Sequence, residues 1–106
     1  MGGPLSAYWI RYRGTHFPLR RAETTIGRSA YCTIVLSNEL ASREHCVLHL
    51  SDTRLSITDL ESRNGTYVNG MRVTSEVGLA PGDGIRVGSD TLEVVDSDAP
   101  RRRAQC

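Results

Sequence analysis

Apolar and polar residues alternate in short runs from Tyr8 to Val95, and turn-forming residues interrupt the pattern roughly every five to ten positions. In residues 45–50, Cys46, Leu48 and Leu50 fall on one face of an extended chain and the residues between them fall on the other. A period of two with such frequent turns predicts many short strands. We expect strands over residues 8–12, 16–20, 24–27, 33–36, 45–50, 55–59, 66–68, 71–73, 85–87 and 91–95.

Two features add detail to this pattern. Asn69-Gly70 stands between two short apolar runs, and both residue types tolerate the positive φ angles of a two-residue type I′ hairpin turn. Pro18 has no backbone donor, so the strand that contains it belongs at a sheet edge. Because no segment shows a helical period with capping residues, we expect an all-β fold, an antiparallel β-sandwich of about 11 short strands.

The alternation stops near both ends of the chain. Residues 1–6 and 96–106 are poor in apolar side chains, and the second segment contains the run Arg101-Arg102-Arg103. We expect a disordered N-terminus over residues 1–6, one folded domain over residues 7–95 and a solvated, Arg-rich tail over residues 96–106. At 106 residues the chain is too short for a two-domain enzyme with a cleft between its lobes.

Composition narrows the classes of function. The 13 basic residues are all Arg, and 12 acidic residues leave a net charge of +1, so no overall field draws the protein to nucleic acid or to an acidic membrane. No apolar run approaches the roughly 18 residues of a membrane span. The three cysteines, Cys32, Cys46 and Cys106, are widely spaced, which favours free thiols over disulfides or a zinc site. We expect a cytoplasmic protein that carries no metal and no other cofactor.

Hydrogen-bond donors concentrate in three predicted loops, at residues 27–29, 40–45 and 62–66. These loops contain Arg, Ser, Thr and Asn side chains, and Gly, which lets backbone amides approach a ligand closely. Donors without matching acceptors suit an oxyanion such as a phosphate. A hydrogen bond to a charged group contributes about 1.5 to 3 kcal/mol, so three or four of them support recognition without any chemical step.

The same loops carry a recognisable set of motifs. Gly27-Arg28, then Ser42-Arg43-Glu44-His45, then Asp59 and Ser62-Arg63-Asn64-Gly65-Thr66-Tyr67-Val68-Asn69-Gly70 resemble, in order and spacing, the signature of the forkhead-associated (FHA) domain. The resemblance covers about Tyr8 to Val95. It implies an FHA/SMAD-like β-sandwich whose loops at one end bind phosphothreonine-containing segments of partner proteins. Ala41 departs from the FHA pattern, in which a larger aliphatic residue often precedes the serine that corresponds to Ser42.

The resemblance also implies roles for individual residues. Arg28 would contact the phosphate, Ser42 would donate its hydroxyl to it, and Arg43 would line the same rim. Arg63 would face the peptide or the phosphate, while Asn64 would hold the peptide backbone through its side-chain amide. Six further signature residues are assigned to architecture, and two of them, His45 and Asn69, are expected to tie loops together by hydrogen bonds to backbone. These architectural residues are Gly27, His45, Gly65, Thr66, Asn69 and Gly70.

Three other classes of function fit the residues less well. A hydrolase built on Ser42, His45 and Asp59 lacks the G-x-S-x-G elbow and an evident oxyanion hole. A zinc site would need His45 and His49, which on a strand lie about 13 Å apart, whereas a zinc ligand lies about 2.1 Å from the metal. Nucleic-acid binding would rest on three consecutive arginines with one Phe, one Trp and four Tyr in the whole chain as stacking partners.

The sequence therefore predicts a non-catalytic phosphopeptide-binding module that recognises phosphothreonine and acts as an adaptor in Ser/Thr-kinase signalling. Its expected partner is a phosphothreonine-containing protein, either a Ser/Thr kinase or a kinase substrate, and neither nucleic acid nor a membrane. The alternative is a structural adaptor on the same fold that binds a protein without phosphate.

Overall fold

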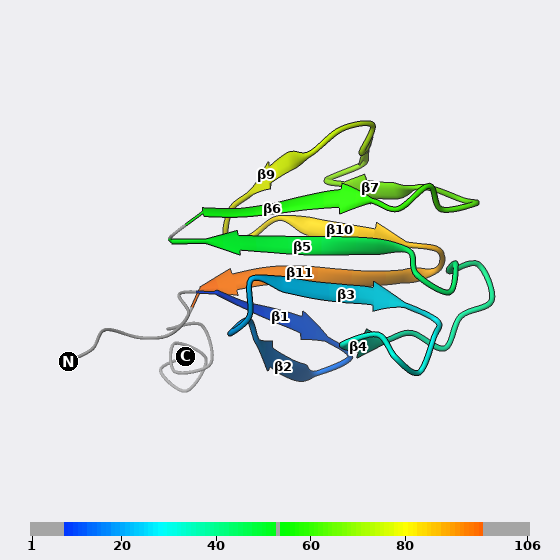
Figure 1. The fold of residues 1–106 in the computed structure, drawn as a ribbon, viewed down its shortest axis with the longest axis horizontal. Coiled ribbons are helices and arrows are strands. Elements are labelled where there is room, and N and C mark those ends of the chain that lie inside the picture. The colour runs from blue at the N-terminus through cyan, green and yellow to red at the C-terminus, as the bar shows by residue number, and fades with distance from the viewer. Residues whose placement is uncertain (1–7, 53, 97–106) are drawn as a thin grey trace.

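The computed structural model describes residues 8–52 and 54–96, and this part of the chain forms eleven strands and no helix. The strands make two packed sheets, so the predicted all-β sandwich is confirmed (Figure 1). The described residues thus contain no helix that is long and apolar enough to cross a membrane. The strands are β1 Tyr8–Tyr12, β2 Thr15–Pro18, β3 Glu23–Gly27, β4 Ile34–Val35, β5 Cys46–Ser51, β6 Arg54–Asp59, β7 Thr66–Val68, β8 Met71–Arg72, β9 Val77–Leu79, β10 Gly84–Val87 and β11 Asp90–Asp96.

One sheet has six strands in the order β2-β1-β11-β10-β7-β8, and the other has five in the order β4-β3-β5-β6-β9. The pairs are antiparallel apart from β3 and β4, which run parallel. β4 pairs only with the last two residues of β3, Ile26 and Gly27. The loop over residues 28–33 therefore has little distance to cover, although a parallel connection ordinarily needs a dozen or more residues.

The core lies between the two sheets and follows the alternation in the sequence. On the six-stranded sheet Leu92 and Val94 of β11 point inward, and on the five-stranded sheet Ile57 of β6 and Leu48 of β5 face them, each at most 1% exposed. Burial of one such side chain stabilises the fold by about 1.5 to 3 kcal/mol. The two sheets are therefore held together mainly by aliphatic packing.

All ten predicted strands are present, with ends that differ by no more than two residues. Sequence patterning missed β9, Val77–Leu79, because a three-residue strand with an exposed glycine at its centre carries a single alternation. Pro18 lies in β2 at the edge of its sheet, as predicted. The expectations for the two termini lie outside the described residues, except that Asp96 is the last residue of β11.

Two of the three two-residue hairpins of the six-stranded sheet use two successive positive φ angles. Arg13 and Gly14, between β1 and β2, have φ of 52° and 80°, and Asn69 and Gly70, between β7 and β8, have φ of 51° and 87°. These values are typical of type I′ turns, whose twist matches that of the flanking strands. The hairpin predicted at Asn69-Gly70 is therefore present.

Three long loops gather at one end of the sandwich, which we call the loop end, on the right in Figure 1. They connect β3 to β4, β4 to β5, and β6 to β7. Gly27 brings the first two together, since a Cβ atom at this position would lie 2.2 Å from the Arg43 carbonyl oxygen. β1 begins and β11 ends at the other end, which we call the far end.

Candidate functional site

Arg28 follows β3 directly and is fixed by the next loop along the chain. Its backbone N–H donates to the Ser42 carbonyl at 3.0 Å, and its side-chain Nε–H donates to the Ala41 carbonyl at 3.0 Å. Arg28 is exposed, and no carboxylate in the described part of the chain forms an ion pair with it. Its guanidinium is therefore oriented by a neutral carbonyl and keeps its charge for a ligand.

His45 links the second loop to the third. The Ser42 backbone N–H donates to His45 Nδ1 at 2.9 Å, so the ring proton is on Nε2, which donates to the Gly65 carbonyl at 2.8 Å. The side chain is fully buried. His45 thus holds two loops in register without facing solvent, which is a structural use of a histidine.

Two further hydrogen bonds join the same loops at the surface. The Arg63 backbone N–H donates to Ser42 Oγ at 3.0 Å, and Asn64 Nδ2 donates to the Leu40 carbonyl at 2.8 Å. Because Ser42 Oγ accepts from Arg63, its own hydrogen points elsewhere and remains able to donate. Asn64 likewise retains its carbonyl oxygen and a second N–H.

Asp59, the last residue of β6, shapes the third loop from beneath. Its carboxylate accepts hydrogen bonds from the Ser62 backbone N–H at 3.0 Å, from Ser62 Oγ at 2.6 Å and from Thr66 Oγ1 at 2.7 Å. Burial alone would raise the pKa of Asp59, but the hydrogen bonds from Ser62 and Thr66 outweigh it and lower that pKa. Sequence reasoning did not assign this role, although Asp followed three residues later by Ser is a common turn-forming pattern.

The three loops surround one shallow depression of about 250 Å³. All five residues predicted to bind phosphopeptide line it, together with Glu39, Leu40 and Ala41 from the second loop, which sequence reasoning did not select. Three guanidinium groups against one carboxylate make the depression positively charged. The lining residues are Arg28, Glu39, Leu40, Ala41, Ser42, Arg43, Arg63 and Asn64.

The residues assigned to architecture divide between the two ends of the sandwich. Gly27, His45, Gly65 and Thr66 lie at the loop end beneath the depression. Asn69 lies at the far end, where its Oδ1 accepts from the Gly84 N–H at 2.9 Å and its Nδ2 donates to Asp83 at 3.0 Å. Gly70 completes the same turn.

The contacts differ from those of a hydrolase triad. His45 Nδ1 accepts from the Ser42 backbone and not from its hydroxyl, and Asp59 is engaged by Ser62 and Thr66. Across residues 8–52 and 54–96, no group of three or more His, Cys, Asp or Glu side chains could hold a metal ion.

A larger depression of about 650 Å³ lies at the far end, between β5, β6 and β9. Several charged groups of this region are already partnered within the protein: Ser56 Oγ donates to Glu76, and Asp83 accepts from Asn69 and from the Ala80 N–H. The smaller depression is the stronger candidate for binding an anion, because three guanidinium groups line it against one carboxylate, whereas the larger depression is lined by Arg54 together with the carboxylates of Glu76 and Asp83.

Comparison with known proteins agrees with this geometry. The family model for the FHA domain matches residues 24–88, which is more than half of the chain. The chain belongs to the FHA domain family.

Two curated relatives come from Mycobacterium tuberculosis. The transcriptional regulatory protein EmbR is 42% identical over 74 residues, and the FHA domain-containing protein FhaB is 32% identical over 81 residues. These matches cover 70% and 76% of this chain but only 19% of EmbR and 52% of FhaB. The chain thus spans about half of one relative and a fifth of the other.

Solved structures show the same likeness. The structure of M. tuberculosis EmbR in complex with a low-affinity phosphopeptide superposes with a TM-score of 0.80 and 34% identity, covering 85% of this chain and 24% of that one. A domain studied for phosphothreonine-dependent FHA interactions superposes with a TM-score of 0.80 and 30% identity, covering 85% of this chain and 96% of that one.

Proposed function

We propose that this domain binds phosphothreonine-containing segments of other proteins and that Arg28 is its main phosphate ligand. The observation that carries the proposal is the convergence of Arg28, Ser42 and Asn64, from three separate loops, on one positively charged depression. A guanidinium beside a hydroxyl donor suits the charged oxygens of a phosphate ester. No reacting nucleophile is needed, so the proposed module is non-catalytic.

The remaining residues have complementary roles in this proposal. Ser42 donates its hydroxyl hydrogen to the phosphate, because Arg63 N–H occupies the acceptor side of its oxygen. Asn64 uses the amide groups left by its bond to Leu40 to hold the peptide backbone. Arg43 and Arg63 are exposed on the rim and add positive charge.

Relatives support the class of ligand. EmbR is seen with a phosphopeptide, and the second structural neighbour belongs to work on phosphothreonine-dependent interactions. By analogy we infer that this domain is an adaptor in Ser/Thr-kinase signalling, with a phosphorylated kinase or kinase substrate as its partner. Partners that co-purify with the domain and are lost after phosphatase treatment would support this role, and partners retained after treatment would contradict it.

The direct test is a titration of a phosphothreonine peptide library against the wild type, Arg28→Ala and Arg54→Ala. Arg54 is exposed at the far end, so its variant makes the same change in net charge away from the depression. We expect Arg28→Ala to weaken binding about 30-fold or more and Arg54→Ala to leave it within about twofold. Equal binding of unphosphorylated peptides, or an Arg28→Ala variant that binds like the wild type, would select the phosphate-independent adaptor instead.

Matched peptides test the choice of phosphorylated residue. The threonine methyl group contributes about 0.8 kcal/mol when buried, so we expect phosphothreonine to bind several-fold more tightly than phosphoserine. Leu40 and Ala41 supply apolar surface at the depression. Phosphotyrosine should bind weakest, because its phosphate lies farther from the peptide backbone. Three equal affinities would contradict threonine selectivity.

A further inference from the structure

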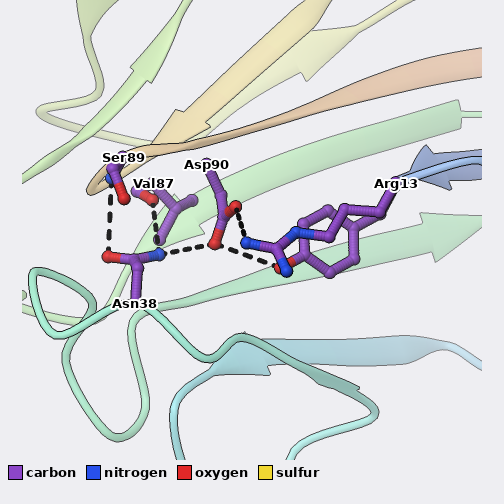
Figure 2. Close-up of polar contacts among 6 residues, drawn as sticks. Arg13, Asn38, Val87, Ser89 and Asp90 are labelled. Atoms are coloured by element: carbon purple, nitrogen blue, oxygen red, sulfur yellow. Dashed lines mark hydrogen bonds and ion pairs between the residues drawn. The ribbon is translucent and has the colours of Figure 1, made fainter.

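Asn38 connects the β4–β5 loop to the opposite sheet, as Figure 2 shows. Its Nδ2 donates to Asp90 Oδ2 at 2.6 Å and to the Val87 carbonyl at 3.3 Å, and its Oδ1 accepts from the Ser89 N–H at 3.4 Å. Both amide hydrogens and the amide oxygen are therefore used. All three partners belong to β10, β11 or the turn between them.

Asp90 is a buried carboxylate, 7% exposed, at the start of β11. Besides Asn38 it accepts a hydrogen bond from the Tyr12 hydroxyl at 3.1 Å, and Arg13 Nη2 forms an ion pair with Oδ1 at 3.2 Å (Figure 2). A buried carboxylate persists only where donors replace water, and three donors do so here. These contacts fix the orientation of Asp90 and, through it, that of Asn38.

The loop also packs closely on the turn beneath it. A Cβ atom at Gly88 would lie 2.2 Å from Asn38 Oδ1 and 2.9 Å from Leu40 Cβ. Gly88 has a φ of 63°, a conformation that glycine adopts without strain. The absence of a side chain at this position therefore lets the β4–β5 loop rest directly on the other sheet.

The anchored residue lies next to the groups that orient the proposed ligand-binding side chains. The Ala41 N–H donates to the Asn38 carbonyl at 3.3 Å, which closes a turn over residues 38–41. Within this turn the Leu40 carbonyl accepts from Asn64 and the Ala41 carbonyl accepts from Arg28. A shift of Asn38 would move both carbonyls and so both side chains.

We propose that Asn38 and Asp90 are positioning residues for phosphopeptide binding: they touch no ligand but fix the loop that aims Arg28 and Asn64. The inference rests on the proposed function. It identifies two determinants of affinity that lie outside the depression and outside the motif residues.

Variants at these two positions test the proposal through peptide affinity. We expect Asn38→Ala and Asp90→Ala to weaken phosphothreonine-peptide binding about tenfold. Asp90→Asn should stay within about twofold of the wild type, because an amide oxygen in place of Oδ2 still accepts from Asn38 and Tyr12. Arg13→Ala removes a half-exposed ion pair and a contact with the Tyr12 ring, both weak, and leaves the donors Asn38 and Tyr12 on Asp90, so it should also stay within about twofold of the wild type. If Asp90→Asn lost peptide affinity tenfold, like Asp90→Ala, the proposal would be overturned. The loss of the negative charge, and not the loss of the hydrogen bonds to Asn38 and Tyr12, would then explain the effect.

A second comparison separates positioning from general stability. Leu79 is buried in β9 at the far end, so Leu79→Ala should lower the melting temperature while affinity, measured well below that temperature, stays at the wild-type level. Asn38→Ala and Asp90→Ala should lower affinity under the same conditions. If all three variants kept wild-type affinity, the positioning role would be excluded.

Hydrogen exchange of the ligand-free protein tests the loop without relying on the proposed ligand. The Ala41 and Arg63 amides donate within this loop system, and we expect Asn38→Ala to speed their exchange about tenfold relative to core amides of β5. Unchanged exchange at both amides would overturn the proposal. A wild type that binds no phosphothreonine peptide would refute the proposed function, while the exchange rates would still decide whether Asn38 holds the loop.

Discussion

Asn64-Gly65 and Asn69-Gly70 are the same dipeptide, separated only by the three residues of β7, and they lie at opposite ends of that strand. Asn64 has no positive φ, is exposed, and makes one side-chain hydrogen bond, to the Leu40 carbonyl. Asn69 has a φ of 51° and uses both ends of its amide, on Asp83 and on Gly84. The first pair leaves polar groups exposed, whereas the second uses them within the fold.

The same contrast holds for the two ends as wholes. At the loop end, backbone carbonyls such as those of Leu40 and Ala41 hold the loops together, and cationic side chains remain exposed around them. At the far end, carboxylates such as Glu76 and Asp83 are engaged by neighbouring side chains and amides. Substitutions of the exposed side chains at the loop end should therefore change binding more than stability, and substitutions of the engaged side chains at the far end should do the reverse.

The largest expected effect is at Gly27, a residue of the loop end whose substitution should change both stability and binding. A methyl group here would lie 2.2 Å from the Arg43 carbonyl oxygen and 2.9 Å from the His45 nitrogen, both backbone atoms that cannot rotate away. We expect Gly27→Ala to destabilise the fold by about 3 kcal/mol and to abolish peptide binding, because the β4–β5 loop must move. Urea unfolding and peptide titration measure the two effects.

Gly78→Ala is the matched control for this prediction. Gly78 lies in β9 with a φ that is not positive, and nothing lies within 4 Å of the position of its Cβ atom. The control should be neutral or slightly stabilising. A Gly27→Ala variant as stable as Gly78→Ala would show that the first two loops can separate without cost.

The second prediction compares alanine substitutions of the two asparagines, Asn69 and Asn64, in stability and in peptide affinity. Asn69→Ala loses two hydrogen bonds and puts alanine at positive φ, so we expect a loss of about 2 kcal/mol in the free energy of unfolding with affinity within twofold. Asn64→Ala should weaken peptide binding about tenfold, with less than about 0.5 kcal/mol lost in stability. Thermal or urea unfolding measures the stability of each variant, and peptide titration measures its affinity.

Asn69→Gly refines the comparison, because glycine keeps the positive φ and removes only the side-chain hydrogen bonds. It should cost about half as much as Asn69→Ala. An Asn69 variant with weakened binding but full stability would contradict the division of roles between the two ends.

Sequence alone predicted much of this arrangement. Alternation located ten strands because each predicted segment contains at least one buried residue, although in the segment 71–73 that residue is Val73, just after β8. Asn69-Gly70 defined its hairpin because few residue types accept two successive positive φ angles. The three donor-rich loops were recognisable because they interrupt that alternation. The full order of the strands within the sheets was not readable, since several pairings, such as β1 with β11 and β6 with β9, join strands that are not consecutive along the chain.

Sequence could not predict the contacts that anchor the β4–β5 loop to the opposite sheet. Asn38 and Asp90 are 52 positions apart, and each reads as an ordinary turn residue until the two sheets are packed. Gly88 likewise looks like any turn glycine, and only the loop lying on it explains why a larger residue would not fit. Long-range polar contacts of this kind leave no periodic signal along the chain.

The third prediction concerns pH and the loop end. Because the folded-state pKa of Asp59 is lowered from its ordinary value of 3.8, the ionised carboxylate stabilises the fold above that value, and this contribution disappears as pH falls through the lowered pKa. We expect Asp59→Asn to be about 1 kcal/mol less stable than the wild type at pH 7 and pH 5. Urea midpoints at pH 7, 5 and 3 should show the difference shrinking at the lowest pH. A difference that stays constant down to pH 3 would mean that the ionised form is not favoured by folding.

The smallest effect tests whether the loop end opens more readily than the far end. Burial raises the pKa of the Cys32 thiol and raises that of Cys46 to about 12, so neither should react with an alkylating reagent at pH 7.5 while the protein is folded. Cys32 Sγ donates to the Arg43 carbonyl and so reports on the second loop. In a Cys106→Ser background, mass spectrometry of tryptic peptides can follow each thiol. We expect Asn64→Ala to speed Cys32 modification about twofold to threefold and Asn69→Gly to leave it unchanged, because only the former variant removes a bond from the loop that carries Arg43.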